Sequence, residues 1–98
     1  MEPISDIDHA TAVVGSVCAR LDAVRGTAFW KIGDADLLSL AETLERVGRL
    51  VYAAQVHLTG EIDTRRVFQD NGAVSTAALL RQRLCISPGD AAARVRAA

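Results

Sequence analysis

Apolar residues recur along most of the chain at intervals of three and four, which is the spacing of one face of an α-helix. The first run is Ile7, Ala10, Val14, Val17, Leu21 and Val24. Ser5 or Asp6 precedes it as a candidate N-cap, so the spacing predicts a helix over residues 6–24. Gly26 interrupts the pattern, and we expect the next segment to form a loop whose Phe29 and Trp30 pack back onto the helices.

A second, longer run begins after Asp34 and Asp36, either of which is a candidate cap. It predicts a helix over residues 34–66, with an apolar seam made by Leu37, Leu40, Leu44, Val47, Val51, Ala54, Leu58 and Ile62. Acidic residues stand four positions before arginines in the pairs Glu42–Arg46, Glu45–Arg49 and Glu61–Arg65. Such pairs stabilise a helix, and their face is expected to be exposed.

These two helices are predicted to form an antiparallel hairpin in which the second helix is the longer. The end of its seam must then be covered by the C-terminal helices, by a second copy of the chain, or by a kink near Gly48 or Gly60. Seams of this spacing on both helices favour a homodimer. Its predicted interface is Val47, Val51, Ala54, Leu58 and Ile62.

The C-terminal quarter predicts two short helices around a tight turn. Asn71-Gly72 supplies the positive-φ positions that end a helix, and Ser75 then caps a helix over residues 75–84. Ser87-Pro88-Gly89-Asp90 is a strong helix start, with a serine cap, a proline at the first position and an acid three residues after the cap. The last helix is predicted over residues 88–98, which gives a helix-turn-helix-like arrangement.

Length and composition favour a single all-α domain over residues 1–98. Half of the residues are hydrophobic and only 4% are aromatic. Because a chain this short buries only about 60 to 65% of its unfolded surface, stability must come from well-packed helices or from association. Cys18 and Cys85 lack the spacing of a disulfide framework or a zinc site, so both are expected to be reduced and buried.

The sequence offers no signal for membrane insertion, secretion or catalysis. No apolar stretch approaches the ~18 to 20 residues of a membrane span, and no basic region precedes an apolar core at the N-terminus. We therefore expect a cytoplasmic protein. No glycine-rich phosphate loop, metal-ligand spacing or nucleophile turn is present, so we expect no enzyme activity, cofactor, metal or small-molecule substrate.

The net charge of −1 conceals an asymmetry along the chain. Residues 1–64 hold ten acids and five bases, whereas residues 65–98 hold six arginines and two aspartates, so the two parts carry −5 and +4. Clustered arginines suit phosphate binding, since neutralised phosphates release counterions. Alternatively, these arginines lie on a solvent-exposed helix face, or they form ion pairs with acidic residues of the same chain.

Several residues of the C-terminal part resemble a known family. The chain resembles the actinobacterial 13E12 repeat proteins, whose N-terminal region is known as domain of unknown function 222 and which often carry an HNH endonuclease domain downstream. The resemblance covers roughly residues 34–98 and is closest over Gly72-Ala73, residues 75–84 and Ser87-Pro88-Gly89-Asp90-Ala91. It implies a regulatory, DNA-associated or oligomerising helical module.

The chain also departs from that family. The family usually has a tryptophan near Leu79 and more arginines where Ala92 and Ala93 stand, which implies weaker phosphate binding here. The only histidines, His9 and His57, are not in an HNH setting, so the family's nuclease activity is not implied.

The first hypothesis is therefore a non-catalytic, homodimeric DNA-binding module that contacts DNA through its basic C-terminal helix-turn-helix-like part. Its predicted DNA-binding residues are Arg81, Arg83, Ser87, Arg94 and Arg96. A last helix that begins with Gly89-Asp90-Ala91 has few side chains able to read a base, so contacts to the backbone are expected. The alternative is a helical dimerisation or protein-interaction module that binds no nucleic acid.

Overall fold

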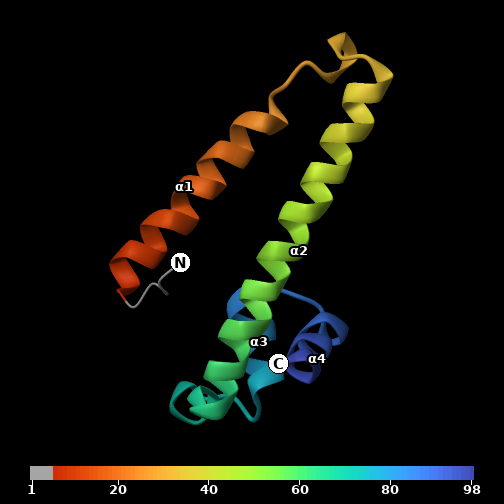
Figure 1. Cartoon of the computed structure of the whole chain (residues 1–98). Helices are drawn as coiled ribbons and strands as arrows, with labels where there is room; N and C mark the ends of the chain where they lie inside the picture. Colours follow the sequence, from red (N-terminus) through yellow and green to blue (C-terminus); the bar gives the residue numbers. More distant parts are fainter. Residues whose placement is uncertain (1–5) are drawn as a thin grey trace. The chain divides into compact units, whose positions relative to one another are not determined.

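The computed structural model describes residues 6–98, and within that range the chain is all-helical with no β-strand (Figure 1). The α-helices are α1 (Ile7–Arg25), α2 (Asp34–Thr64), α3 (Thr76–Leu84) and α4 (Pro88–Ala97). Two short 3-10 helices, η1 (Phe29–Lys31) and η2 (Val67–Asn71), lie between them. The prediction of an all-α fold, with a long helix followed by two short ones, is confirmed. The candidate cap Ser5 lies outside the described residues.

The chain divides into two compact units, Met1–Ser39 and Leu40–Ala98, and the boundary falls inside α2. In the first unit, the Asp6 carboxylate accepts a hydrogen bond from the Asp8 backbone N–H at 2.9 Å and so caps α1. None of the α1 residues is buried. Ile7 is 76% exposed and Val14 is 68% exposed, although both belong to the predicted apolar seam.

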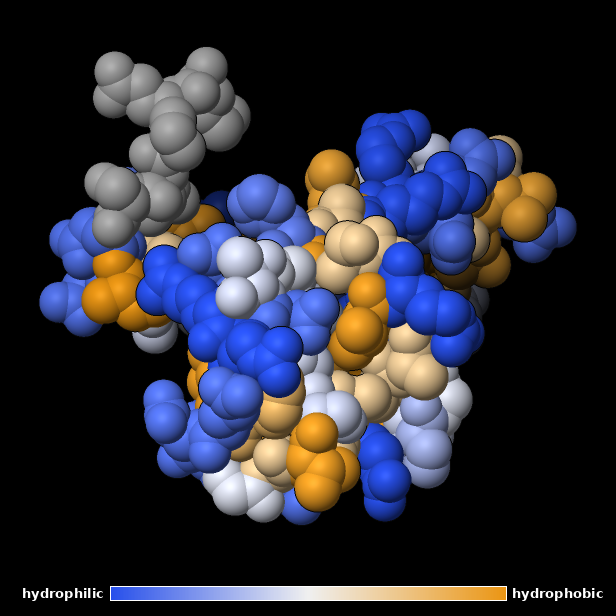
Figure 2. Space-filling view, turned by 90° about the horizontal axis from the view of Figure 1, so that it is seen from below, coloured by the Kyte–Doolittle hydropathy of each residue, from blue (hydrophilic) through white to orange (hydrophobic). Residues whose placement is uncertain are grey.

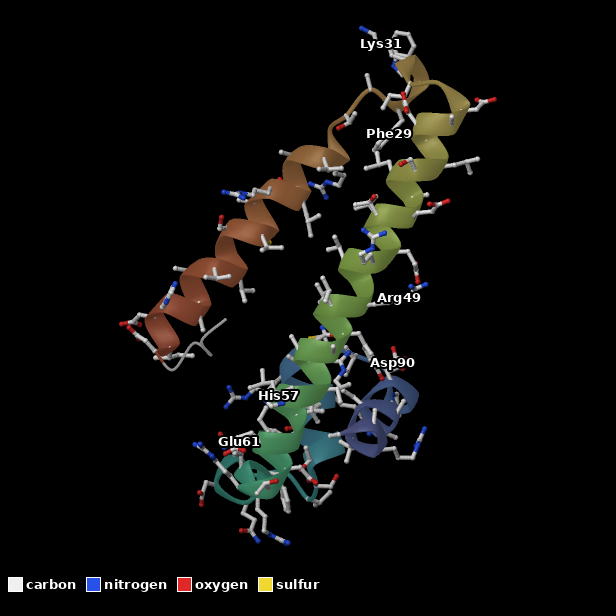
Figure 3. The ribbon with its side chains drawn as sticks, in the orientation of Figure 1. Phe29, Lys31, Arg49, His57, Glu61 and Asp90 are labelled. Atoms are coloured by element: carbon white, nitrogen blue, oxygen red, sulfur yellow. The ribbon has the colours of Figure 1, made fainter. Side chains whose placement is uncertain are left out.

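The expectation that Trp30 packs onto the helices is wrong. Trp30 is 83% exposed, and the ammonium of Lys31 lies 5.0 Å from the centroid of its ring. Phe29 and Trp30 are successive residues of η1, and successive side chains of a 3-10 helix point about 120° apart. Both rings therefore cannot face the same neighbouring helix. Figure 3 marks Phe29 and Lys31 in this connection between α1 and α2.

Burial of the two cysteines is also predicted wrongly, because Cys18 and Cys85 are both exposed. Cys18 lies on α1, where no side chain is buried. Cys85 lies at the end of α3 in the left-handed conformation, with φ 54° and ψ 41°. A residue in that conformation turns the chain away from the helix, so its side chain does not continue the apolar face of α3.

In the second unit, α2 ends at Thr64, two residues before the predicted end. Arg66 adopts the left-handed conformation at φ 51° and starts η2, and the predicted positive-φ position at Gly72 is confirmed at 71°. The helix is continuous through Gly48 and Gly60. The chain reverses direction at Arg66 and again at Gly72, and these two reversals bring α3 back to the last turns of α2.

A small core holds this second unit together. Its buried side chains, among the described residues, are Leu79, Leu80, Ala91, Thr59 and Thr76. α3 packs against both α4 and η2. Ala91 has no exposed surface, so α4 approaches α3 closely through a residue without a large side chain.

The C-terminal helices cover the last turns of α2 and leave its middle uncovered. Thr59 is buried and Ile62 half-buried, whereas Val51 and Ala54 are exposed. A Cβ placed on Gly60 would lie 3.7 Å from the Cβ of Ala98, which puts the end of α4 beside α2. The C-terminal helices therefore cover only the end of the apolar seam of α2 and leave the rest of the seam exposed.

Candidate nucleic-acid interface

The α3–α4 connection has the form of a tight helix-turn-helix corner. Only Cys85, Ile86 and Ser87 separate the two helices. The Ser75 hydroxyl accepts from the Ala78 N–H at 3.1 Å to cap α3, and the Ser87 hydroxyl accepts from the Asp90 N–H at 3.0 Å to cap α4. Pro88 occupies the start of α4, as predicted. These local interactions fix where each helix begins, since they satisfy N–H groups that lack an intrahelical partner.

The base of this corner is tied to α2 by one polar contact, in which the Thr76 hydroxyl donates to the Asp63 carboxylate. Within α2 itself, the Thr59 hydroxyl donates to the backbone carbonyl of Gln55 at 2.7 Å. Thr59 and Thr76 are both buried. Sequence periodicity missed these residues, because buried threonines fall outside an apolar stripe. Figure 3 marks His57 and Glu61 on the same part of α2 and Asp90 at the start of α4.

The predicted DNA-binding residues differ in how accessible they are. Arg81, Arg83 and Arg96 are exposed, and Ser87 is exposed with its hydroxyl engaged in the cap of α4. Arg94 is half-buried, and its Nε is a buried atom without a hydrogen-bond partner among residues 6–98. The five residues therefore do not form one uniform exposed surface.

Neighbouring polar groups orient one of these arginines. An Nη of Arg83 donates to the side-chain carbonyl of Asn71 at 3.0 Å. The amide nitrogen of Asn71 in turn donates to the backbone carbonyl of Val67 at 2.8 Å. Asn71 thus ties the Arg83 guanidinium to η2, a link of twelve residues that no local pattern indicates.

Among the described residues, ion pairs engage three arginines, and none of these lies on α3 or α4; Arg20, Arg46 and Arg66 form no ion pair either. Arg25 pairs with Asp22 at 2.7 Å, Arg65 with Glu61 at 2.8 Å, and the Arg49–Glu45 contact is 3.9 Å. Within the described part of the chain, no carboxylate lies within 4.0 Å of the guanidinium nitrogens of Arg81, Arg83, Arg94 or Arg96. The corner therefore carries positive charge that the protein itself does not neutralise.

Arg66 belongs to the same basic segment and was not predicted as a functional residue. Its guanidinium carbon lies 5.3 Å from the centroid of the Phe68 ring. Figure 2, which views the molecule from the end that carries η2, shows strongly hydrophilic residues interspersed with apolar ones on this face. The face is mixed in character and not uniformly basic.

The predicted dimer interface lies wholly in the second unit. Val51 is 43% exposed and Leu58 is 61% exposed, and Ala54 is exposed as well. Val47 and Ile62 are half-buried. The middle of α2 therefore presents apolar side chains that nothing within its unit covers.

Comparison of the chain with protein-family models, with curated proteins and with solved structures finds no match. Across the described residues, no helix is both long enough and apolar enough to span a membrane. Nor do histidine, cysteine, aspartate and glutamate side chains form a group of three or more that could hold a metal, as far as residues 6–98 are concerned.

Proposed function

We propose that the chain is a non-catalytic helical module that associates with DNA through the α3–α4 corner. The observation that carries this proposal is the set of arginines on that corner without carboxylate partners. Unpaired guanidinium groups gain from phosphate contacts because they lose no internal ion pair on binding. The expected relationship of residues 34–98 to the 13E12 repeat proteins, for which no family model matches, is consistent with this proposal.

Binding in this proposal is directed at the DNA backbone. Arg81, Arg83 and Arg96 make the contacts, and half-buried Arg94 contributes charge. The first turn of α4 carries Gly89 and the acidic Asp90, and Ala91 is buried against α3. Such a helix start has almost nothing with which to read base edges, so contacts to phosphates dominate affinity.

The test is a titration of mixed-sequence duplex DNA with the full chain at two ionic strengths. Arg81→Gln with Arg96→Gln is expected to lower affinity and to reduce the salt slope by roughly one to two units. The matched control is Arg20→Gln with Arg49→Gln, which removes the same charge outside the corner and should change affinity far less. Equal loss in both double variants would refute a role for the corner and leave only a net-charge effect.

We also propose that the chain works as a homodimer. Exposed apolar residues on α1 and on the middle of α2 favour this, because a small protein with so little buried surface gains stability by association. The proposed interface is the seam formed by Val47, Val51, Ala54, Leu58 and Ile62. A dimer without DNA affinity would establish the alternative function, a helical protein-interaction module.

Sedimentation equilibrium tests the dimer independently of DNA. Val51→Asp places a charge on the seam and should shift the chain toward monomer. Leu50→Asp is the matched control, since Leu50 is also exposed but lies about 100° further around the helix. A wild-type monomer at high concentration would contradict the proposal.

A further inference from the structure

A cavity of about 490 Å³ lies within the second unit, between the last turns of α2, η2, α3 and α4. That volume falls in the range of small-molecule sites. Its apolar wall is formed by Leu58, Ile62, Val67, Leu79, Leu80 and Leu84. Leu58 and Leu84 are exposed, so the apolar wall reaches the surface.

The polar side of the cavity carries positive charge. Arg83 and Arg94 both line it, together with the uncharged Gln55, Thr59 and Asn71. No aspartate or glutamate is among the lining residues. The chain therefore brings two guanidinium groups to a largely apolar cavity and supplies no counter-charge there.

Arg94 lines this site and carries an N–H donor that the described residues leave unsatisfied. Its Nε is buried and has no hydrogen-bond partner in the described part of the chain. A buried donor without a partner is rare in folded proteins, because its desolvation is not compensated. Arg83 keeps one donor on Asn71 at 3.0 Å, and a guanidinium has five N–H donors in all. Both arginines thus have Nη donors left for an anionic acceptor, since the described residues engage only one Nη, that of Arg83 on Asn71.

We propose that this cavity binds a small organic carboxylate with an apolar chain, of the medium-chain fatty acid type. The carboxylate accepts hydrogen bonds from Arg94 and Arg83, for which a planar fork of donors is well matched. The hydrocarbon chain covers the leucines of the wall and removes them from water. This site shares Arg83 and Arg94 with the proposed DNA contact but differs from it in the ligand, which must have an apolar body as well as a negative charge.

The experiment uses the full chain, without DNA, and three probes that separate the two parts of the ligand. Sodium octanoate, below its micellar concentration, carries both head and chain; 1-octanol has the same chain and no charge; acetate has the charge and no chain. Binding is followed by amide chemical shifts and by calorimetry. Octanoate is expected to bind at least about tenfold more tightly than either of the others. Its shifts should be confined to α3, α4, η2 and the last turns of α2.

Arg94→Met tests the role of the guanidinium while it keeps an unbranched side chain. It is expected to lower octanoate affinity about tenfold and to leave octanol binding unchanged. Arg96→Met is the matched control on the exposed side of α4, and Arg83→Met is a second variant if Arg94→Met alters the fold. Equal affinity for octanoate and octanol, or unchanged octanoate binding in both Arg94→Met and Arg83→Met, would overturn the proposal. Binding of an acidic peptide but not of octanoate would overturn it as well.

Discussion

The hydroxyl of Thr76, at the first turn of α3, donates a hydrogen bond to the carboxylate of Asp63, near the end of α2. Thr76 is buried, whereas Asp63 is exposed. This contact spans thirteen residues and closes the chain reversal made by η2 and Gly72. It fixes the position of the α3–α4 corner on α2.

Removing this hydroxyl should destabilise the second unit. Thr76→Val keeps the shape of the side chain but loses the hydrogen bond, and we expect a loss of about 1 to 2 kcal/mol in the free energy of unfolding. Urea denaturation followed by circular dichroism measures it. Thr64→Val, at the exposed end of α2, is the control and should change stability by less than about 0.5 kcal/mol. Equal stability of Thr76→Val and the wild type would mean that the contact contributes nothing.

Cys85 provides a second prediction, because it holds a conformation that favours glycine. Its φ of 54° and ψ of 41° lie in the left-handed region, which costs a residue with a Cβ about 1 to 2 kcal/mol. Cys85→Gly removes that cost, but glycine also gives the unfolded chain more conformational entropy. We therefore expect a net increase of about 0.5 to 1 kcal/mol in the free energy of unfolding.

The control for that substitution is Cys18→Gly, in the interior of α1. There the same change should lower stability or helix content, since glycine costs about 1 kcal/mol in a helix. Thermal unfolding under reducing conditions compares the two. A stability loss in Cys85→Gly would indicate that the Cys85 side chain makes contacts that outweigh the backbone strain.

The sequence predicted those parts of the fold that depend on neighbours in the chain. Ser75 and Ser87 cap their helices, and Gly72 takes a positive φ, because caps and turns are decided by a few adjacent residues. The four helices follow from apolar periodicity. The left-handed conformation of Arg66 was not predicted, because arginine does not favour a φ of 51°. The chain reverses direction twice to return α3 to α2, and the first reversal falls at Arg66.

The site was less predictable than the helices, because it depends on contacts between residues that are far apart in the sequence. The apolar seam of α2 indicated Leu58 and Ile62, yet the buried residue on these turns is Thr59. Which face of α2 receives α3 and α4 depends on the path through η2, and helical spacing alone does not specify it. The same spacing could not show that Arg94 lines a cavity while Arg96, two residues later, is exposed.

The third prediction concerns two glycines, whose replacement by alanine should change the free energy of unfolding in opposite directions. Gly48 lies inside α2, and a Cβ built there would meet nothing within 4 Å. Gly48→Ala should therefore raise the free energy of unfolding by about 0.5 to 1 kcal/mol. Gly72 also has open space around it but has a φ of 71°, so Gly72→Ala should lower stability by about 1 kcal/mol. Urea denaturation of both variants separates the effect of backbone conformation from that of space, and a gain in both would contradict the positive φ at Gly72.

The different surroundings of Arg94 and Arg96 lead to the last prediction, which concerns DNA. Arg96 is exposed, so Arg96→Gln should remove one phosphate contact and reduce the salt slope of binding by about one unit. Arg94 is half-buried with its Nε in the protein, so Arg94→Gln should reduce the slope by less than half as much. Titrations of one duplex at several salt concentrations, with both single variants and the double variant, measure this difference. Equal reductions would contradict this difference and show that the Arg94 guanidinium reaches a phosphate as readily as that of Arg96.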